Sequence, residues 1–595
     1  MSKRILVIGG VAAGASAAAR ARRTSEDVEI TLVESGPYMS FANCGLPYYV
    51  GGEIAERSSL FVANPRQFAA RFRVDVRLST EATAVDTAAR TVSVRTPEGA
   101  TESLAYDRLV ITTGTDPIIP PVPGLDGPNV YLCRTVPDVD AIMERLEAMS
   151  RTELEGIRDS SLDWNPQSSQ YAGLRALVIG GGYIGLEVAE QLLHRGIGVT
   201  LVEAADQLMG PLDPEVAGPV EEAMREAGAR VLVGDAVAAL EHTSNDRIIA
   251  RMSSGAECRV DLVVLGAGVR PNVALAEAAG IALGPTGAIA VDKHQRTSDP
   301  AVFAAGDNCE AVFAPTGQPV NIPLAGPANK MGRVAGDNAA WDLAGAPGDD
   351  PQRLRMPAVL GTGIVRAAGV VAGGTGLSEK WARREGIPVS TTYLVSTDHA
   401  GYYPNASRLG LKVLYDPATG RLLGGQAVGR NGVDKRLDII ATAITGGMTV
   451  HDLEDLDLCY APPFGAAKDP VIMTGFISGN AARGTAPGIT PGELAAELSS
   501  GNGEAPFILD VRSRREYANG RLAGSLNIPL EKVRERMGEV PRDRLVVAQC
   551  AGGYRSYVAQ QILRNHGYDN VRNLYGGFGL AVRVPELAAL VESDD

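Results

Sequence analysis

The sequence is poor in cysteine, and the few cysteines it has are scattered. Six occur in 595 residues, at positions 44, 133, 258, 309, 459 and 550, and no two form a Cys-x-x-Cys pair. This spacing excludes a disulfide-stapled scaffold and the common zinc sites. We therefore expect no metal site, and a chain that works in a reducing cytoplasm.

The chain also lacks an excess of positive charge and an apolar run long enough to cross a bilayer. Its formal net charge of −14 argues against nucleic acid as a partner. An Ala-rich run after Lys3 and Arg4 superficially resembles a signal peptide, but Gly14, Ser16 and Arg20 interrupt it. Neither a membrane span nor a nucleic-acid partner is expected.

The N-terminal stretch instead has the pattern of a dinucleotide-binding unit. Residues 3–33 are predicted to form a strand, a glycine turn, a helix and a second strand. Gly9 and Gly14 keep the tight turn and the helix–strand contact, although Val11 replaces the middle glycine. Glu34 ends the second strand, where a carboxylate can accept hydrogen bonds from a ribose diol.

Residues 175–203 repeat this pattern in complete form. A strand leads into Gly180, Gly182 and Gly185, which match Gly-x-Gly-x-x-Gly, and a helix follows. Glu203 ends the next strand. A carboxylate there accepts from a ribose 2′-hydroxyl and repels a 2′-phosphate, so NADH is favoured over NADPH.

Two further strands indicate a flavin. One ends at Thr113 and Gly114 and is expected to return to the first sheet. The other, at 301–305, leads into Gly306 and Asp307, whose carboxylate can accept from a ribitol chain. Cys44 is the candidate redox cysteine, and no second cysteine lies near it in the sequence. A single redox cysteine needs an electron carrier between it and a hydride donor, and FAD is such a carrier.

The candidate redox cysteine is Cys44, in the segment Ser40–Tyr49. A glycine follows it and a proline lies three residues on, so we expect the thiol on a turn or a helix start, where backbone N–H groups favour the thiolate. A buried structural cysteine is the commoner fate of a lone thiol. The two predicted nucleotide sites and a second cysteine-centred loop around Cys550 favour a redox role for Cys44.

Basic residues form a possible patch near this thiol. Arg20 and Arg23 lie towards the end of the first helix, and Arg71 and Arg73 lie in a later segment. They form either a solvated surface or a binding patch for a phosphorylated ligand that reaches towards Cys44.

The C-terminal region contains a second cysteine-centred loop. A strand leads into Cys550, a glycine-rich loop follows, and Arg555 opens a helix. The N–H groups of such a loop form a cradle that stabilises a thiolate, a persulfide or a bound oxyanion.

These motifs together resemble the pyridine nucleotide-disulfide oxidoreductases. Within them, the chain is similar to the single-cysteine coenzyme A-disulfide reductases that are fused to a rhodanese domain. The resemblance covers nearly the whole chain except residues 150–173. It rests on the two glycine turns, Ser40–Cys44, Ala305–Asp307, Leu324–Asn329, Tyr460–Phe464 and the Cys550 loop.

The resemblance implies FAD and NADH as cofactors, with NADPH as the second option for the hydride donor, and coenzyme A as substrate or bound thiol. It places NADH against Gly180, Gly182, Gly185 and Glu203. It places FAD against Gly9, Gly14, Glu34, Thr113, Gly114, Gly306, Asp307, Pro327 and Ala328. Cys44 would carry coenzyme A as a mixed disulfide, and the candidate contacts of that ligand are Arg20, Arg23, Ser40, Asn43, Arg71 and Arg73.

The resemblance also implies a homodimer in which tyrosines of the partner subunit complete each active site. Relatives of the glutathione reductase type use a His–Glu pair, which we do not find, because His451 lies on a predicted surface turn. The candidates are Tyr460 and either Tyr402 or Tyr403, of which Tyr403 is favoured; a satisfied buried aromatic is the alternative for each. In the rhodanese domain the catalytic candidates are Cys550 and Arg555.

The expected fold class is α/β, with two Rossmann-like nucleotide-binding domains, an α+β interface domain and a rhodanese domain. This makes the four domains that the length suggests. The expected boundaries are 1–120 with 285–335 for FAD, 121–284 for NADH with an insertion at 150–173, 336–478 for the interface, 479–487 for a linker and 488–595 for rhodanese.

The expected function is reduction of coenzyme A disulfide, persulfides or polysulfide by NAD(P)H through FAD and Cys44, with the rhodanese domain handling sulfane sulfur. The first alternative is an NADH oxidase or peroxidase in which Cys44 cycles through sulfenic acid. Such relatives usually carry His near position 11, where this chain has Val11 and Ala13. The second alternative is a non-enzymatic redox or sulfur sensor.

Overall fold

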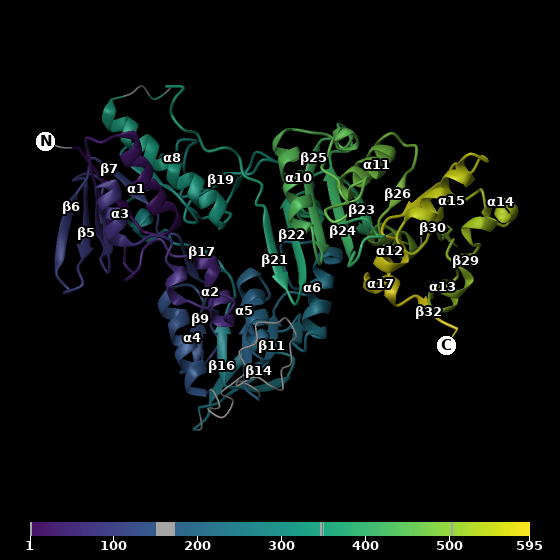
Figure 1. The fold of residues 1–595 in the computed structure, drawn as a ribbon, viewed down its shortest axis with the longest axis horizontal. Coiled ribbons are helices and arrows are strands. Elements are labelled where there is room, and N and C mark those ends of the chain that lie inside the picture. The colour runs from purple at the N-terminus through teal and green to yellow at the C-terminus, as the bar shows by residue number, and fades with distance from the viewer. Residues whose placement is uncertain are drawn as a thin grey trace. The chain divides into compact units, whose positions relative to one another are not determined.

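The computed structural model describes residues 3–149, 173–244, 246–345, 348, 350–500 and 504–594. The chain divides into an N-terminal unit (residues 1–206 and 224–361) and a C-terminal unit (residues 207–223 and 362–595). Both units mix helices with strands, which confirms the α/β class (Figure 1). The expected insertion lies outside the described residues, apart from residue 173. No helix in the described ranges is long and apolar enough to span a membrane.

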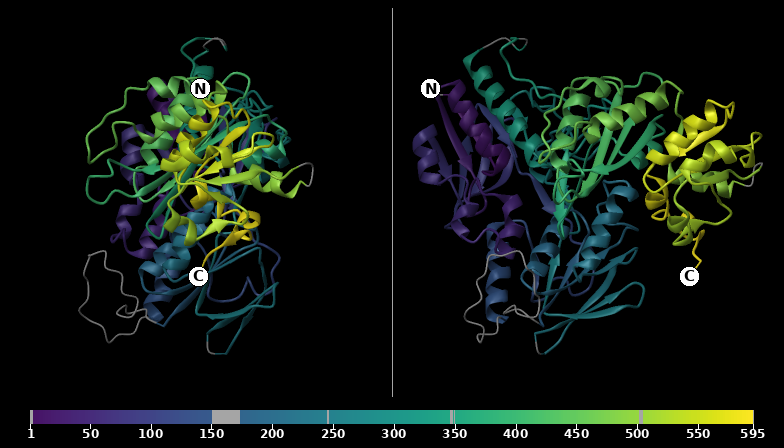
Figure 2. Two further views of the ribbon diagram at one scale, coloured as in Figure 1. Left: turned by 90° about the vertical axis from the view of Figure 1, so that its right-hand side faces the viewer. Right: turned by 45° about the vertical axis from the view of Figure 1, so that its right-hand side comes forward.

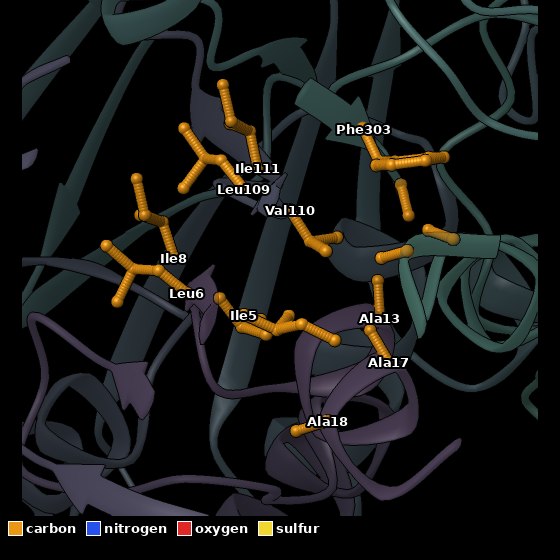
Figure 3. Packing of buried hydrophobic residues seen from close by; sticks show 14 of the residues in the cluster. Ile5, Leu6, Ile8, Ala13, Ala17, Ala18, Leu109, Val110, Ile111 and Phe303 are labelled. Carbon is orange, nitrogen blue, oxygen red and sulfur yellow. The ribbon is translucent and has the colours of Figure 1, made fainter. Parts of the chain in front are cut away.

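The first sheet of the N-terminal unit is parallel and has the order β18-β7-β1-β2-β3. Its strands are β1 (Lys3–Ile8), β2 (Val28–Val33), β3 (Val74–Arg77), β7 (Arg108–Ile111) and β18 (Val302–Ala304). Most residues of these strands are apolar, and Ile5–Ile8 and Leu109–Ile111 of the central strands are buried, as expected for a parallel sheet that is covered on both faces. Figure 3 shows Ile5, Val110 and Phe303 on the side of the sheet where Ala13 and Ala17 of the first helix lie, whereas Leu6, Ile8, Leu109 and Ile111 point to the other side.

Two helices of this half pack through small residues. Helix α1 (Ala12–Thr24) lies beside α8 (Ala325–Ala344), the purple and teal helices of Figures 1 and 2. A Cβ at Gly332 would lie 2.1 Å from the Ala13 carbonyl oxygen, and one at Gly336 would lie 2.1 Å from that of Ala17. Only glycine allows this approach of the two backbones.

The second sheet is parallel too and repeats the first, with the order β12-β11-β10-β16-β9. Its strands are β9 (Val130–Leu132), β10 (Arg175–Ile179), β11 (Gly198–Glu203), β12 (Arg230–Val233) and β16 (Leu262–Leu265). Helix α5 (Tyr183–His194) follows β10 as α1 follows β1, and α4 (Val136–Met149) follows β9. The predicted repeat of strand, glycine turn and helix is therefore confirmed.

Each of these halves also has a three-stranded antiparallel sheet. The first consists of β4 (Glu81–Asp86), β5 (Thr91–Arg95) and β6 (Thr101–Ala105). The second consists of β13 (Val237–His242), β14 (Ile248–Met252) and β15 (Glu257–Val260). The remaining helices that concern the site are α2 (Leu46–Gly51) and α3 (Pro65–Phe72).

The C-terminal unit begins with an antiparallel sheet of order β21-β22-β25-β24-β23. Its strands are β21 (Gly363–Ala367), β22 (Val370–Gly376), β23 (Ser390–Thr397), β24 (Arg408–Tyr415) and β25 (Leu422–Gly429). The helices α10 (Val433–Thr445) and α11 (Pro470–Ala482) pack against it. Helix α11 continues four residues into the expected linker and packs on β23 and β24, where the buried Ser478 hydroxyl is hydrogen-bonded to that of Thr392.

A buried ion-pair cluster anchors residues 207–223 in this unit. The Lys412 side chain is 1% exposed, and its Nζ lies 2.8 Å from Asp213 and 2.7 Å from Glu379. Glu215 is also paired with it. The three carboxylates are close enough together to hold a metal ion, but the ammonium group of Lys412 already pairs with all of them.

The last part of the chain is a parallel sheet of order β26-β31-β30-β27-β29. Its strands are β26 (Gly488–Ile489), β27 (Phe507–Asp510), β29 (Leu526–Asn527), β30 (Val546–Gln549) and β31 (Val571–Leu574). The helices are α12 (Pro491–Ser499), α13 (Arg514–Ala518), α14 (Val533–Arg536), α15 (Tyr554–Arg564), α16 (Gly577–Ala581) and α17 (Pro585–Ala588).

Candidate active site

The two glycine turns have the same geometry. Gly9 and Gly180 adopt φ of +96° and +106°, and a Cβ at Gly14 or Gly185 would lie 1.8 Å from the carbonyl oxygen of Gly9 or Gly180. The turns therefore require glycine at both positions.

The two acidic residues that follow these turns are also placed alike. Glu34 accepts from the Gly10 N–H (2.6 Å) and the Gly36 N–H (2.8 Å). Glu203 accepts from the Gly181 N–H (2.6 Å) and the Ala205 N–H (2.8 Å). Each carboxylate is thus fixed at a strand end beside its turn, where dinucleotide-binding folds hold a ribose.

The residues expected to hold a flavin gather at the ends of β1, β7 and β18. Thr113 donates to the Asn272 carbonyl (2.6 Å), and Asn308 donates to Thr113 (3.1 Å). Asp307 Oδ1 is buried, and no hydrogen-bond donor to it is found among the described residues. Burial raises the pKa of Asp307 above its ordinary value, and the positive charge of Arg134 offsets this effect only in part.

This environment fits FAD. A buried acceptor without a donor is costly in a folded protein, and a ribitol hydroxyl is a suitable donor for Asp307. Gly306, at φ +99°, and the buried Ala328 lie close together beside it. Pro327 precedes Ala328 in the first turn of α8 and is half-buried.

Cys44 lies at a helix start, as predicted. Asn43–Gly45 form a short 3₁₀ turn that leads directly into α2, and α2 packs against α5. Asn43 donates to the carbonyl oxygen of Arg134 at 3.4 Å. Ser40 adopts φ +46° and donates its N–H to Gly10 at 2.9 Å, which joins the cysteine segment to the first glycine turn.

The electrostatics around Cys44 differ from the sequence-based expectation. The residue is exposed to solvent, yet protein atoms crowd the sulfur enough that burial raises the pKa of the thiol. Glu187 and Asp307 raise it further, and the backbone hydrogen bond that lowers it does not compensate. The backbone hydrogen bond alone therefore does not favour the thiolate of Cys44, because burial, and to a lesser extent Glu187 and Asp307, raise the pKa of the thiol.

Two of the four arginines in the candidate patch, Arg20 and Arg73, already form ion pairs within the protein. Arg20 pairs with Asp337, a fully buried carboxylate of α8, at 2.8 Å. Arg73 pairs with Glu26 at 3.4 Å on the surface. Arg23 donates from Nε to the Ala19 carbonyl and is exposed, as is Arg71. Arg23 and Arg71 thus remain the better placed of the four for an anionic ligand.

Two of the three candidate tyrosines, Tyr402 and Tyr460, contact each other, whereas Tyr403 contacts a different residue. The Tyr402 and Tyr460 hydroxyls are hydrogen-bonded at 3.0 Å, which raises the pKa of Tyr402. Both side chains are exposed, at 77% and 47%. Tyr403, which the sequence favoured, instead stacks edge-on against His399. None of the three is the buried aromatic that was considered as an alternative.

The Cys550 loop forms the predicted cradle. The sulfur accepts from the Gly553 N–H (3.1 Å) and from the Ser556 hydroxyl (3.3 Å), and Cys550 is 2% exposed. Gly553 adopts φ +106°. The Cys550 carbonyl oxygen accepts from the Phe578 N–H, and a Cβ at Gly577 would lie 2.2 Å from that oxygen. The start of α16 therefore packs tightly on the loop.

Arg555 makes a bidentate ion pair with Glu516, at 2.8 and 2.6 Å. This pair lowers the pKa of Glu516 to about 2. Glu516 in turn raises the pKa of Arg555, and Cys550 makes a smaller contribution in the same direction. Arg555 therefore links the sulfur to a carboxylate and is not a free cation.

Sequence reasoning missed two acidic residues at these sites. Glu187 accepts from the Tyr48 hydroxyl at 3.1 Å and acts on the Cys44 thiol; its signal was a lone acid in the apolar start of α5. Glu516 had a local signal in the sequence, because its Ser-x-x-Glu capping box with Ser513 marks the start of α13, but this signal indicates a helix start and not a partner for Arg555.

Comparisons with known families follow the same division of the chain. Residues 3–332 match the family Pyridine nucleotide-disulphide oxidoreductase, and residues 368–470 match the dimerisation domain of that family. Residues 490–580 match the Rhodanese-like domain.

Individual proteins are similar over most of the chain. The reduced CoADR-RHD of Bacillus anthracis has 38% identity and a TM-score of 0.89, covering 99% of each chain. An NAD-dependent persulfide reductase of A. fulgidus has 36% identity and a TM-score of 0.83, covering 97% of this chain and 99% of that one. An NAD(P)H sulfur oxidoreductase (CoA-dependent) of Pyrococcus furiosus is 35% identical over 79% of this chain and 98% of its own, while an NADH oxidase of Enterococcus faecalis is 28% identical over 78% of this chain and 96% of its own. This chain therefore belongs to the pyridine nucleotide-disulphide oxidoreductase family and carries a C-terminal rhodanese-like domain.

Proposed function

We propose that the chain is an FAD-dependent reductase that uses NAD(P)H to reduce coenzyme A disulfide and coenzyme A or other low-molecular-weight persulfides or polysulfide. One observation carries this proposal: a single thiol, Cys44, lies between two nucleotide-type glycine turns and has no Cys-x-x-Cys partner. Its disulfide must then form with a substrate thiol. Similar proteins named for coenzyme A, sulfur and persulfide reduction support that choice of substrate.

Each cofactor would have its own residues. FAD would lie against Gly9, Glu34, Asp307 and the start of α8, and when bound it would relay the electrons of NADH to the sulfur of Cys44. NADH would lie against Gly180, Gly182, Gly185 and Glu203. The fixed Glu203 carboxylate favours NADH, since it would repel a 2′-phosphate.

Cys44 would perform the sulfur chemistry. Its thiolate attacks the coenzyme A sulfur of a disulfide or persulfide, so that a Cys44–coenzyme A disulfide forms and a coenzyme A thiolate or hydrosulfide leaves. Two electrons then cleave this mixed disulfide and return the Cys44 thiolate and coenzyme A. Ser40, Asn43, Arg23 and Arg71 are the proposed contacts of the coenzyme A moiety, with Arg20 and Arg73 held in ion pairs beside them.

The leaving thiolate needs a proton, and exposed hydroxyls of the dimerisation domain are suited to supply it. We assign this role to Tyr402 and Tyr460 of the partner subunit in a homodimer, since these two hydroxyls are hydrogen-bonded to each other. The same proposal keeps the expected domains, with the linker beginning after α11 at residue 483 and not at 479. It places the enzyme in a reducing cytoplasm, which its six scattered, unpaired cysteines favour.

The test is Cys44→Ser in the full-length holoenzyme. We expect the variant to keep FAD, as judged from its visible spectrum, and to lose NADH-dependent reduction of coenzyme A disulfide and persulfide. Cys459→Ser, which changes another exposed cysteine, is the matched control and should keep both. An active Cys44→Ser enzyme would contradict the proposal, whereas rapid NADH consumption by oxygen or peroxide alone in the wild type would favour the oxidase alternative.

A further inference from the structure

A pocket of about 440 Å³ lies beside the Cys550 loop in the rhodanese-like domain. It is lined by residues that directly follow β27 and β29, among them Val511 and Pro529, and by Arg555 from the start of α15. The carboxyl ends of parallel strands are where α/β sheets bind ligands. Its volume is in the range of small-molecule sites, about 300–1,000 Å³.

Arg555 connects this pocket to the sulfur. It lines the pocket, and it is also the side chain whose charge interacts with Cys550. Arg555 also directly precedes Ser556, whose hydroxyl donates to the Cys550 sulfur at 3.3 Å, so the pocket adjoins the part of α15 that contacts the sulfur. The Arg555–Glu516 ion pair holds the Arg555 side chain in place.

The charges of the pocket are not equally available to a ligand. Lys532 pairs with Glu535 at 2.9 Å, and Arg536 pairs with Glu539 at 2.7 Å. Arg514 also lines the pocket and is exposed. Within the described part of the chain, no hydrogen bond or ion pair of its guanidinium group is found.

We propose that this pocket binds the body of an organic persulfide that carries an anionic group, and that Arg514 recognises that group. This inference rests on the proposed role of Cys550 in handling sulfane sulfur. An inorganic donor of a few atoms would leave most of the pocket empty, whereas a thiol with a peptide or pantetheine body fills it. Arg514 can pair with either a carboxylate or a phosphate, because its planar guanidinium matches both.

The transfer step requires no oxidant or reductant. The Cys550 thiolate attacks the outer sulfur of R–S–SH, so that a Cys550–sulfur bond forms and the R–S bond to that sulfur breaks. The electron pair leaves with R–S⁻, which takes up a proton as the free thiol. Cys550 is left as a persulfide within the cradle of Gly553 and Ser556.

The experiment measures the rate of Cys550 persulfidation by mass spectrometry, in the full-length holoenzyme without NADH. Four probes form two pairs: glutathione persulfide with its diethyl ester, and coenzyme A persulfide with pantetheine persulfide. Each pair differs in anionic groups. The variants are Arg514→Ala, Arg514→Lys and the matched control Arg515→Ala, which removes an exposed arginine next in sequence that does not line the pocket.

We expect the wild type and Arg515→Ala to prefer the anionic member of at least one pair by about tenfold, Arg514→Lys to keep part of that preference, and Arg514→Ala to lose it. Loss in the glutathione pair alone identifies a carboxylate as the recognised group, and loss in the coenzyme A pair alone identifies the phosphate-bearing nucleotide portion, which pantetheine lacks. Equal rates within both pairs in the wild type, or an unchanged preference in Arg514→Ala, would overturn the inference. Failure of the proposed reductase function is separately visible, because NADH oxidation depends on Cys44 and not on Arg514.

Discussion

Single residues decide where protons and charges lie at the two sulfur centres. Burial raises the pKa of Cys44, and Glu187 and Asp307 raise it further, whereas Cys550 accepts hydrogen bonds within a closed loop. A thiolate leaving from the Cys44 reaction must be protonated. The proposed donors are Tyr402 and Tyr460, whose hydroxyls are hydrogen-bonded so that either can donate to the other.

Phenylalanine substitutions separate the three tyrosines. We expect Tyr402→Phe and Tyr460→Phe each to lower kcat for coenzyme A disulfide by about 100-fold, the usual order for loss of a general acid. Tyr403→Phe is the control and should stay close to the wild-type value, because its ring packs on His399 outside the pair. Steady-state kinetics of the three variants test this, and a large effect confined to Tyr403→Phe would instead support Tyr403, the residue that the sequence favoured.

At the scale of elements, the flavin half depends on how closely two helices approach. Helices α1 and α8 meet through Gly332 and Gly336, whose missing side chains leave room for the α1 carbonyls. The α8 N-terminus carries Pro327 and Ala328, so the packing of this helix also positions two of the proposed flavin contacts.

Two helical glycines give a test of this packing and its control. Gly336→Ala would place a methyl group 2.1 Å from the Ala17 carbonyl oxygen, and overpacking of this kind costs about 1–3 kcal/mol. The control is Gly492→Ala in the exposed first turn of α12, which meets no atom within 4 Å, and the helix propensity of alanine should make it neutral or slightly stabilising. Thermal unfolding of the holoenzymes checks both; an unchanged midpoint for Gly336→Ala would show that the helices move apart at little cost.

The elements and the two turns were predictable because each rests on a local pattern. The strand at 175–179 has the predicted bounds, and the glycine turns follow from positions where only glycine fits. Ion-pair partners were not predictable, because Arg20 meets Asp337 and Arg555 meets Glu516 only in the folded chain. The choice between Tyr402 and Tyr403 could not be made from the sequence for a similar reason, since adjacent residues on an irregular loop give no signal of the direction of their side chains.

At the scale of the whole molecule, the chain builds its C-terminal unit partly from an earlier segment. Residues 207–223 leave the N-terminal unit and are fixed by Lys412 on β24. Burial would lower the pKa of Lys412, but Glu215, Asp213 and Glu379 raise it overall. Burial opposes ionisation of Asp213, but Lys412 and two backbone N–H groups leave its pKa lowered.

Lys412→Met should cost about 3–5 kcal/mol, because it leaves buried carboxylates without a counter-charge. In the wild type, ionised Lys412 makes its full contribution to the free energy of unfolding below the ordinary lysine pKa near 10.4. This contribution is lost as the pH rises through the raised pKa of Lys412. The Asp213 contribution is present above its ordinary pKa near 3.9 and is lost as the pH falls. Between these limits the wild-type contribution is nearly constant, whereas the variant should gain stability as the pH falls towards the carboxylate range.

Denaturant unfolding at several pH values measures both effects. Lys532→Met is the control, since it breaks an exposed pair that is worth less than about 1 kcal/mol. Equal losses in the two variants would mean that the buried cluster does not anchor the segment.

The most direct test of the proposed function is anaerobic NADH oxidation by the purified holoenzyme with coenzyme A persulfide, with sulfide recorded at the same time. The account predicts one sulfide released per NADH oxidised, and no turnover in Cys44→Ser. NADH oxidation that requires oxygen or peroxide, or that proceeds without sulfide from the persulfide, would contradict it.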